Sequence, residues 1–193
     1  MSLFEPHTPL PAGFDYQADF VQDHESLERV LWKRLDWFQQ EIMMFGKPVL
    51  QPRLVAWYAE AGVDYGYSGI RLQPRAFPAP LDMLRERLFQ ALGQRFNSVL
   101  CNGYRDGSDS MGWHADDEPE LGPRPLIASV SLGQTRRFRI RSRVSKESVG
   151  LDLEPGSLLL MHGHSQRDYQ HALPKTRRAV GRRINLTFRQ VLS

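Results

Sequence analysis

The chain has 193 residues, 41% of them hydrophobic, with 25 Lys plus Arg against 22 Asp plus Glu and a formal net charge of +3. This length and apolar content predict a single folded domain with a real core and exclude a disordered tail. The lone cysteine, Cys101, excludes a disulfide framework and cysteine-based zinc sites, and no stretch is long and apolar enough to cross a membrane.

The N-terminal third predicts an arm followed by a helix. Residues 1–22 contain Pro6, Pro9 and Pro11 without a sustained period, so we expect an extended arm. The N-terminal residues include Glu5 and lack an apolar core, which argues against a signal peptide and favours the cytoplasm. Residues 24–39 carry apolar side chains at helical spacing and predict a helix.

A second helix and a series of strands follow. Pro80 at the start, a leucine stripe and Gly93 at the end predict a helix over residues 80–92. The later segments are short and punctuated by Gly and Pro, and they predict strands over 97–104, 126–132, 137–142, 149–153, 157–161 and 183–191. Helices followed by many short strands predict an α+β chain with a jelly-roll core and flanking N-terminal helices, folded as one domain over residues 23–193.

The strand region also holds a basic run. Residues 121–145 contain six arginines and no acid, and in the predicted strand 137–142 the side chains of Arg137, Arg139 and Arg141 share one face. Arginine forks match phosphate oxygens, so this face is a candidate nucleic-acid contact. An ordinary solvated surface is the alternative, and the charge pattern by itself does not choose between them.

A metal site is indicated by the tripeptide His114-Ala115-Asp116. In an extended segment residues two apart point to the same side, so His114 and Asp116 can converge on one ion. A third ligand has to come from a distant strand: His171 is the candidate, and His162 and His164 compete with it. Two imidazoles and one carboxylate with open positions select Fe(II) oxygenase chemistry.

The predicted C-terminal strand supports such chemistry. Its residues at 184, 186 and 188 are apolar and share one face, while Arg183, Asn185, Thr187 and Arg189 share the other. A half-exposed strand with a solvated polar face is the ordinary interpretation. Two arginines flanking Asn and Thr nevertheless form a suitable cradle for a dicarboxylate, because each guanidinium can grip a carboxylate through two hydrogen bonds.

Four segments together resemble one enzyme family: CNGYRDGSDSMGWHADDEPELG, PLIASVSLGQTRRFRIR, LEPGSLLLMHG and RRINLTFRQ. They are similar to the AlkB family of Fe(II)- and 2-oxoglutarate-dependent dioxygenases, and most similar to its DNA-alkylation-repair homologues, over roughly residues 45–191. The resemblance implies a double-stranded β-helix, a cupin-like jelly roll. It also implies iron ligands His114, Asp116 and His171, and the co-substrates 2-oxoglutarate and O2.

The same resemblance assigns further site residues. It implies that Arg183 pairs with the distal carboxylate of 2-oxoglutarate, and the remaining co-substrate contacts that it implies are Asn102, Tyr104, Asn185 and Arg189. Residues 40–75 correspond to a nucleotide-recognition segment. The substrate contacts it implies are Tyr67, which sandwiches the base, its neighbour Tyr65, Asp117 at the exocyclic amine, Glu118 in a less defined role, and Phe45 as a base-flipping wedge.

As the family implies, the function is oxidative demethylation of 1-methyladenine and 3-methylcytosine in DNA. That reaction couples 2-oxoglutarate and O2 to succinate, CO2 and formaldehyde. The wedge-like segment around Phe45 resembles the duplex-preferring homologue, while residues 51–54 resemble the single-strand-preferring one, so both DNA forms are expected partners of a monomer. The same chemistry on RNA or a protein side chain, and a non-catalytic nucleic-acid-binding jelly roll, are the alternatives.

Overall fold

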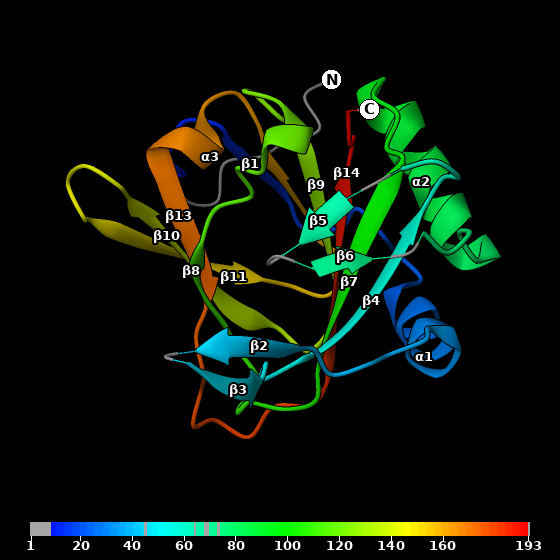
Figure 1. The fold of residues 1–193 in the computed structure, drawn as a ribbon, viewed down its shortest axis with the longest axis horizontal. Helices are drawn as coiled ribbons and strands as arrows, with labels where there is room; N and C mark the ends of the chain where they lie inside the picture. Colours follow the sequence, from blue (N-terminus) through cyan, green and yellow to red (C-terminus); the bar gives the residue numbers. More distant parts are fainter. Residues whose placement is uncertain (1–8, 45, 64, 68–69, 73, 193) are drawn as a thin grey trace.

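Figure 1 shows two antiparallel β-sheets that face each other in the computed structural model, which describes residues 9–44, 46–63, 65–67, 70–72 and 74–192. The larger, the main sheet, runs through β1 (Phe14–Gln17), β12 (Leu158–Met161), β9 (Ile127–Gly133), β14 (Arg183–Arg189), β7 (Ser98–Tyr104) and β4 (Leu54–Ala59). The smaller, the minor sheet, runs through β11 (Ser148–Leu153), β10 (Arg136–Ser142), β13 (Tyr169–Leu173) and β8 (Met111–His114). The predicted jelly-roll fold class is confirmed.

Two helices, α1 (His24–Arg34) and α2 (Ala79–Leu92), pack on the outer face of the main sheet (Figure 1). The predicted leucine stripe of α2 is buried against the sheet at Leu81, Leu84 and Leu88. The helix ends where Gly93 takes a left-handed φ of 68°, a conformation that costs glycine nothing. Both helices therefore shield one side of the main sheet and leave its other side to the minor sheet.

The first helix ends earlier than the sequence predicts, at Arg34 instead of residue 39. Leu35 turns to an extended ψ of 143° and is buried in the core, and the Asp36 N–H donates to the hydroxyl of Tyr58 at 3.0 Å. Phe38 then bridges to Val55 of β4. Contacts with the sheet thus override a helical pattern that local propensity would continue.

The predicted N-terminal arm needs a correction. Part of residues 1–22 forms β1, whose Phe14 pairs with Met161 and whose Gln17 pairs with Leu158 at one edge of the main sheet. Phe14 and Tyr16 alternate with more exposed residues along β1, and their buried side chains join the apolar cluster between the sheets. The strands β4, β8 and β13 were also missed by the sequence pattern, because β4 is apolar on both faces and β8 and β13 are only four and five residues long.

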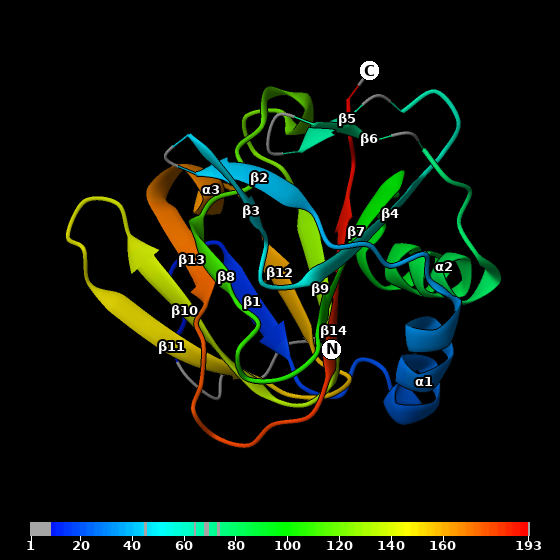
Figure 2. The same cartoon turned by 60° about the horizontal axis from the view of Figure 1, so that its bottom comes forward.

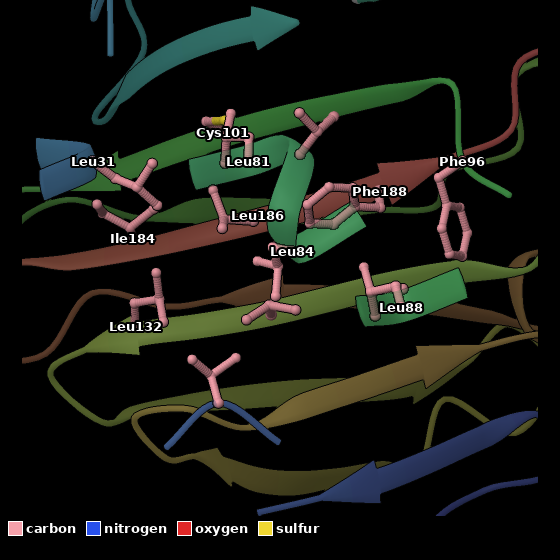
Figure 3. Close-up of a cluster of buried hydrophobic side chains, with 14 of the residues drawn as sticks. Leu31, Leu81, Leu84, Leu88, Phe96, Cys101, Leu132, Ile184, Leu186 and Phe188 are labelled. Carbon is pink, nitrogen blue, oxygen red and sulfur yellow. The ribbon is translucent and has the colours of Figure 1, made fainter. Parts of the chain in front are cut away.

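The last strand, β14, divides its side chains between two environments (Figure 3). Ile184, Leu186 and Phe188 point into the cluster under the helices, and all three are fully buried. The opposite face, expected to be solvated in the ordinary interpretation, points between the sheets, and there Arg183 and Arg189 are buried as well. Cys101, as expected, is a core residue; burial raises the pKa of its thiol.

Two small hairpins complete the fold. One is made of β2 (Glu41–Met44) and β3 (Lys47–Leu50), the other of β5 (Tyr65–Tyr67) and β6 (Ile70–Leu72). Figures 1 and 2 place both hairpins on the same side of the two sheets. Between them in the chain lies β4, so part of the predicted nucleotide-recognition segment 40–75 belongs to the main sheet. Among the described helices, none combines the length and apolar character of a membrane span.

Replacing Leu186 with Ala should lower the free energy of unfolding by about 2–5 kcal/mol, because it leaves a cavity at the centre of the packed cluster. Urea titration followed by circular dichroism measures the change. Met83, an exposed residue of α2, provides the matched control: Met83→Ala should change stability by less than about 0.5 kcal/mol. Equal effects of the two substitutions would contradict the assigned core.

Candidate active site

The structure brings His114, Asp116 and His171 together between the sheets. His171 lies on β13 directly opposite His114 on β8, and Asp116 follows β8 by two residues. One ligand atom from each of the three lies within 4.8 Å of the others. The competing His162 and His164 lie elsewhere: His162 pairs with Asp15 at 2.8 Å, and His164 precedes the short helix α3 (Ser165–Asp168).

Hydrogen bonding sets the orientation of His114. Its Nδ1 lies 2.9 Å from the carbonyl oxygen of Gly112, which can only accept, so Nδ1 carries the proton. The lone pair is therefore on Nε2, which faces the Asp116 carboxylate at 3.9 Å. Burial lowers the pKa of both histidines, that of His171 to about 3 with a further contribution from His114. Both rings are thus neutral at pH 7, the form that binds metals.

Asp116 is held from two directions. A guanidinium nitrogen of Arg189 lies 2.8 Å from its carboxylate, and the Asp116 backbone N–H donates to Oε1 of Gln166 at 2.9 Å. Burial by itself raises the pKa of Asp116, but the positive charge of the adjacent Arg189 outweighs it and lowers the pKa to about 2. The carboxylate is therefore ionised, as a metal ligand must be.

The inner face of β14 pairs across the sheet with the polar residues of β7. Arg183 lies opposite Tyr104 and Asn185 lies opposite Asn102, so four predicted co-substrate contacts form two cross-strand pairs. The Arg183 guanidinium lies 5.3 Å from the Tyr104 ring centre and donates to Ser131 Oγ at 2.8 Å. Its Nε is buried without a hydrogen-bond partner among the described residues, and burial lowers its pKa to about 10.

One pocket joins these groups. Its walls come mainly from β7, β8, β13 and β14, with one residue each from β9, β10 and β12. The predicted metal and co-substrate residues among its lining are Asn102, Tyr104, His114, Asp116, His171, Arg183, Asn185 and Arg189. The other lining positions include Leu100, Phe138 and Met161, which make part of the wall apolar. The pocket therefore places a possible metal-ligand set beside a buried, incompletely paired guanidinium.

Of the five predicted substrate contacts, the structure describes the side chains of two, Asp117 and Glu118. Asp117 is exposed, and its carboxylate accepts a hydrogen bond of 2.6 Å from Arg143, while Glu118 is half-buried at the start of the short 3-10 helix Pro119–Leu121. Tyr65 and Tyr67 belong to β5, of which only the backbone pairing is described. Phe45 lies outside the described residues. The assignments to these five residues stay predictions.

Three polar residues of the site were not assigned a role from the sequence. Gln166 holds the backbone of Asp116, Arg143 holds the side chain of Asp117, and the buried Arg53 donates to Oδ1 of Asn102 at 2.9 Å. Each of these three contacts joins residues that lie at least 26 positions apart in the sequence. No local sequence pattern predicts such contacts, so they can be identified only from the folded structure.

Most of the chain matches a known protein family. A family model described as the 2OG-Fe(II) oxygenase superfamily matches residues 17–189. The chain is a member of this superfamily. Its relatives there use Fe(II), 2-oxoglutarate and O2. A solved structure entitled "The structure of OsALKBH1" covers 95% of the chain with a TM-score of 0.67 at 19% identity, and all of that chain is covered, which supports the fold.

Within the superfamily the chain belongs with the AlkB homologues. It is 45% identical over 185 residues to the rat (Rattus norvegicus) alpha-ketoglutarate-dependent dioxygenase alkB homolog 3, covering 91% of this chain and 60% of that protein. It is 38% identical over 190 residues to the mouse (Mus musculus) DNA oxidative demethylase ALKBH2, covering 92% and 80%. The chain thus spans about 60% of the length of the alkB homolog 3 relatives that it matches.

The residues present fit the family's iron and 2-oxoglutarate. Two neutral imidazoles and one ionised carboxylate within 4.8 Å form the donor set that Fe(II) oxygenases use. Arg183 adds a buried cation whose Nε has no hydrogen-bond partner in the part of the chain that the structure describes, and a dicarboxylate would satisfy it. The fit rests on these two features of the pocket.

We expect Gln166→Leu to weaken Fe(II) binding by about 10- to 100-fold, because it removes the hydrogen bond that fixes the Asp116 backbone while keeping the side-chain volume. Anaerobic equilibrium dialysis measures the affinity. Gln90→Leu on α2, where the amide bonds only to Glu86 at the surface, is the matched control and should bind iron as the unmodified chain does. An unchanged affinity in Gln166→Leu would show that Asp116 needs no such support.

Proposed function

We propose that this protein oxidatively demethylates N-alkylated bases in DNA, with 1-methyladenine and 3-methylcytosine as substrates. The observation that carries the proposal is the pocket in which the His114, Asp116 and His171 donors lie beside the buried Arg183. The printed name of the mouse relative, DNA oxidative demethylase, supports the substrate class. A cysteine-poor chain with a basic strand face also suits a cytoplasmic enzyme that binds nucleic acid as a monomer.

In the proposed mechanism the three ligand residues would hold iron, with the lone pair of His114 Nε2 kept available by the hydrogen bond at Nδ1. Arg183 would bind the distal carboxylate of 2-oxoglutarate, and Tyr104, Asn102 and Asn185 would contact the rest of it. When bound, iron with 2-oxoglutarate and O2 supplies the oxidising chemistry, in which one oxygen atom enters succinate and the other the methyl carbon, which leaves as formaldehyde.

The chain's own residues prepare the pocket for this reaction. Arg189 keeps Asp116 ionised and oriented, in addition to its predicted contact with the co-substrate. The apolar walls around the cluster exclude water and strengthen these electrostatic interactions. On the substrate side, Tyr65, Tyr67, Asp117 and Glu118 are the proposed base contacts. Because Arg143 already binds the Asp117 carboxylate, base recognition by Asp117 would have to share or release that ion pair.

A substrate panel tests the proposal. The holoenzyme is given single-stranded DNA, duplex DNA and RNA, each with one 1-methyladenine or 3-methylcytosine, and formaldehyde and succinate are measured. We expect formaldehyde from methylated DNA and none from unmethylated controls or after iron chelation. If succinate forms at the same rate with and without nucleic acid, the assignment of a base as substrate is wrong. If formaldehyde is released from methylated RNA alone, the assignment to DNA is wrong. If no turnover is measured, the protein is not such an enzyme.

A pair of histidine variants tests the assigned ligands. His171→Ala should lower Fe(II) affinity by at least about 100-fold and abolish formaldehyde release, because the donor set loses one of three members. His162→Ala, which removes only the ring that pairs with Asp15, should retain both properties. Equilibrium dialysis measures Fe(II) affinity directly, so a loss of iron binding can be distinguished from a loss of turnover. A reversed outcome would move the site to the other histidine.

A pair of adjacent arginines tests the co-substrate site. Arg183→Lys should raise the KM for 2-oxoglutarate by roughly 10- to 100-fold, since a lysine cannot reproduce the fork of two N–H donors, while iron binding persists. Arg182→Lys changes the neighbouring guanidinium, which pairs with Glu28 outside the pocket, and should leave this KM unaltered. Steady-state kinetics at varied 2-oxoglutarate distinguishes the two, and equal KM values would remove Arg183 from the co-substrate site.

A further inference from the structure

The strand β8 separates the pocket from the outer face of the minor sheet. His114 of β8 points into the pocket, and its neighbour Trp113 points to the opposite face of the same strand, where 38% of it is exposed. In the strand order β11-β10-β13-β8, β8 forms an edge, as Figure 2 shows. A polymer that leaves the pocket can therefore pass over this single edge and reach the outer face.

Arginines dominate that outer face. On the four strands of the minor sheet its charged side chains are Arg137, Arg139, Arg141 and Asp152, a net charge of +2 from three cations and one anion. Arg137 pairs with Asp152 at 3.0 Å. Arg139 donates to Ser148 Oγ and Arg141 to Gln170 Oε1, and neither has an acidic partner among the described residues. Two positive charges on this face are thus uncompensated.

The exposed tryptophan extends this basic row to the edge of the sheet. The Arg141 guanidinium stacks on Trp113, 4.2 Å from the ring centre, across β13. From that stack the three arginines follow β10 at every second residue, roughly 6.7 Å apart by the rise of a strand. The face therefore offers, in order, a planar aromatic and guanidinium surface at the pocket edge and then a line of cations.

This order of groups matches a single-stranded nucleic acid. Bases stack on aromatic rings and guanidinium planes without regard to sequence, and arginines contact the phosphates. A duplex keeps its bases stacked inside and cannot offer them to the Trp113–Arg141 surface, and an acidic protein segment would complement the arginines but offers no base for that surface. Charge complementarity and the order of the groups, a stacking surface followed by cations, thus favour an extended polyanion carrying aromatic bases.

We propose that single-stranded DNA flanking the base in the pocket binds along this outer face, with the Trp113–Arg141 stack as its base platform and Arg139 and Arg137 on its phosphates. The inference rests on the proposed function, because it takes the pocket as the place of the methylated base. It adds a second contact region, and so predicts that affinity grows with the length of the flank on one side of the lesion.

The test compares single-stranded DNA probes that carry one 3-methylcytosine. A fluorescent trimer is compared with two 12-mers, one extended only on the 5′ side and the other only on the 3′ side. Fluorescence anisotropy is measured with the enzyme loaded with Fe(II) and 2-oxoglutarate without O2. One of the two extensions should tighten binding by about tenfold relative to the trimer, and the other should add little. Equal gains from both sides, or from neither, would overturn the proposal.

Two variants of the face should remove that gain. Trp113→Ala should reduce the ratio of trimer to 12-mer Kd values to near one, since the loss of one stacked base costs about tenfold in affinity. Arg139→Gln with Arg141→Gln provides an independent variant and should also lower the slope of log Kd against log salt by about 1.4. Arg29→Gln on α1, an exposed arginine far from this sheet, is the control that should keep the full ratio. Unfolding midpoints verify that each variant is folded.

The two proposals fail in different ways. If the length effect persists in both face variants, the outer face is not the binding path, whatever the turnover of the enzyme. The same probes are also made as RNA, and if only the RNA 12-mers give the gain, the assignment to DNA is wrong. Absence of formaldehyde from every methylated probe would instead overturn the proposed function, and anisotropy would still report whether the face binds single strands.

Discussion

Arg189 and Asp116 are buried together between the two sheets, with 2.8 Å between guanidinium and carboxylate and no more than 4% of either side chain exposed. Burying such charges is costly, and removing one partner of a buried pair leaves the other uncompensated. Asp116 therefore depends on Arg189 to remain ionised, and its charge in turn is what a cluster of neutral histidines needs to attract a metal. Because Arg189 stands on β14 and Asp116 follows β8, the same pair connects the main sheet to the end of the minor sheet.

Much of the site could be predicted because its residues form short-range patterns in the sequence. The HxD spacing and the alternation of β14 are properties of extended backbone, and the structure shows His114 with Asp116 in one cluster and Arg183 with Asn185 in one pocket. The resemblance to the AlkB family selected His171 over His162 and His164, and His171 is the one that the structure places opposite His114. The roles of these residues in binding remain part of the proposal.

What could not be predicted depends on contacts between distant segments. The extra strand β1 pairs only because β12, more than 140 residues later, presents an open edge. The early end of α1 depends on Tyr58 and Val55, which belong to the strand β4. Likewise, Gln166 looks like any polar helix residue until α3 is placed under Asp116. In each case the deciding partner lies far along the chain, where local propensity and periodicity carry no information.

The position of β14 has a consequence for how the molecule forms. It is the last described strand in the chain, yet it pairs on one side with β9 and on the other with β7, whose paired residues precede it by 79 to 91 positions. Sheets completed by such distant pairings form slowly, because closing a long loop costs chain entropy before the new contacts can compensate for that loss. Until that closure Arg183 and Arg189 are not in place, so the co-substrate side of the pocket and the central layer of the sheet are acquired in one cooperative step. A chain interrupted before residue 183 would carry all three members of the metal cluster but neither of these arginines.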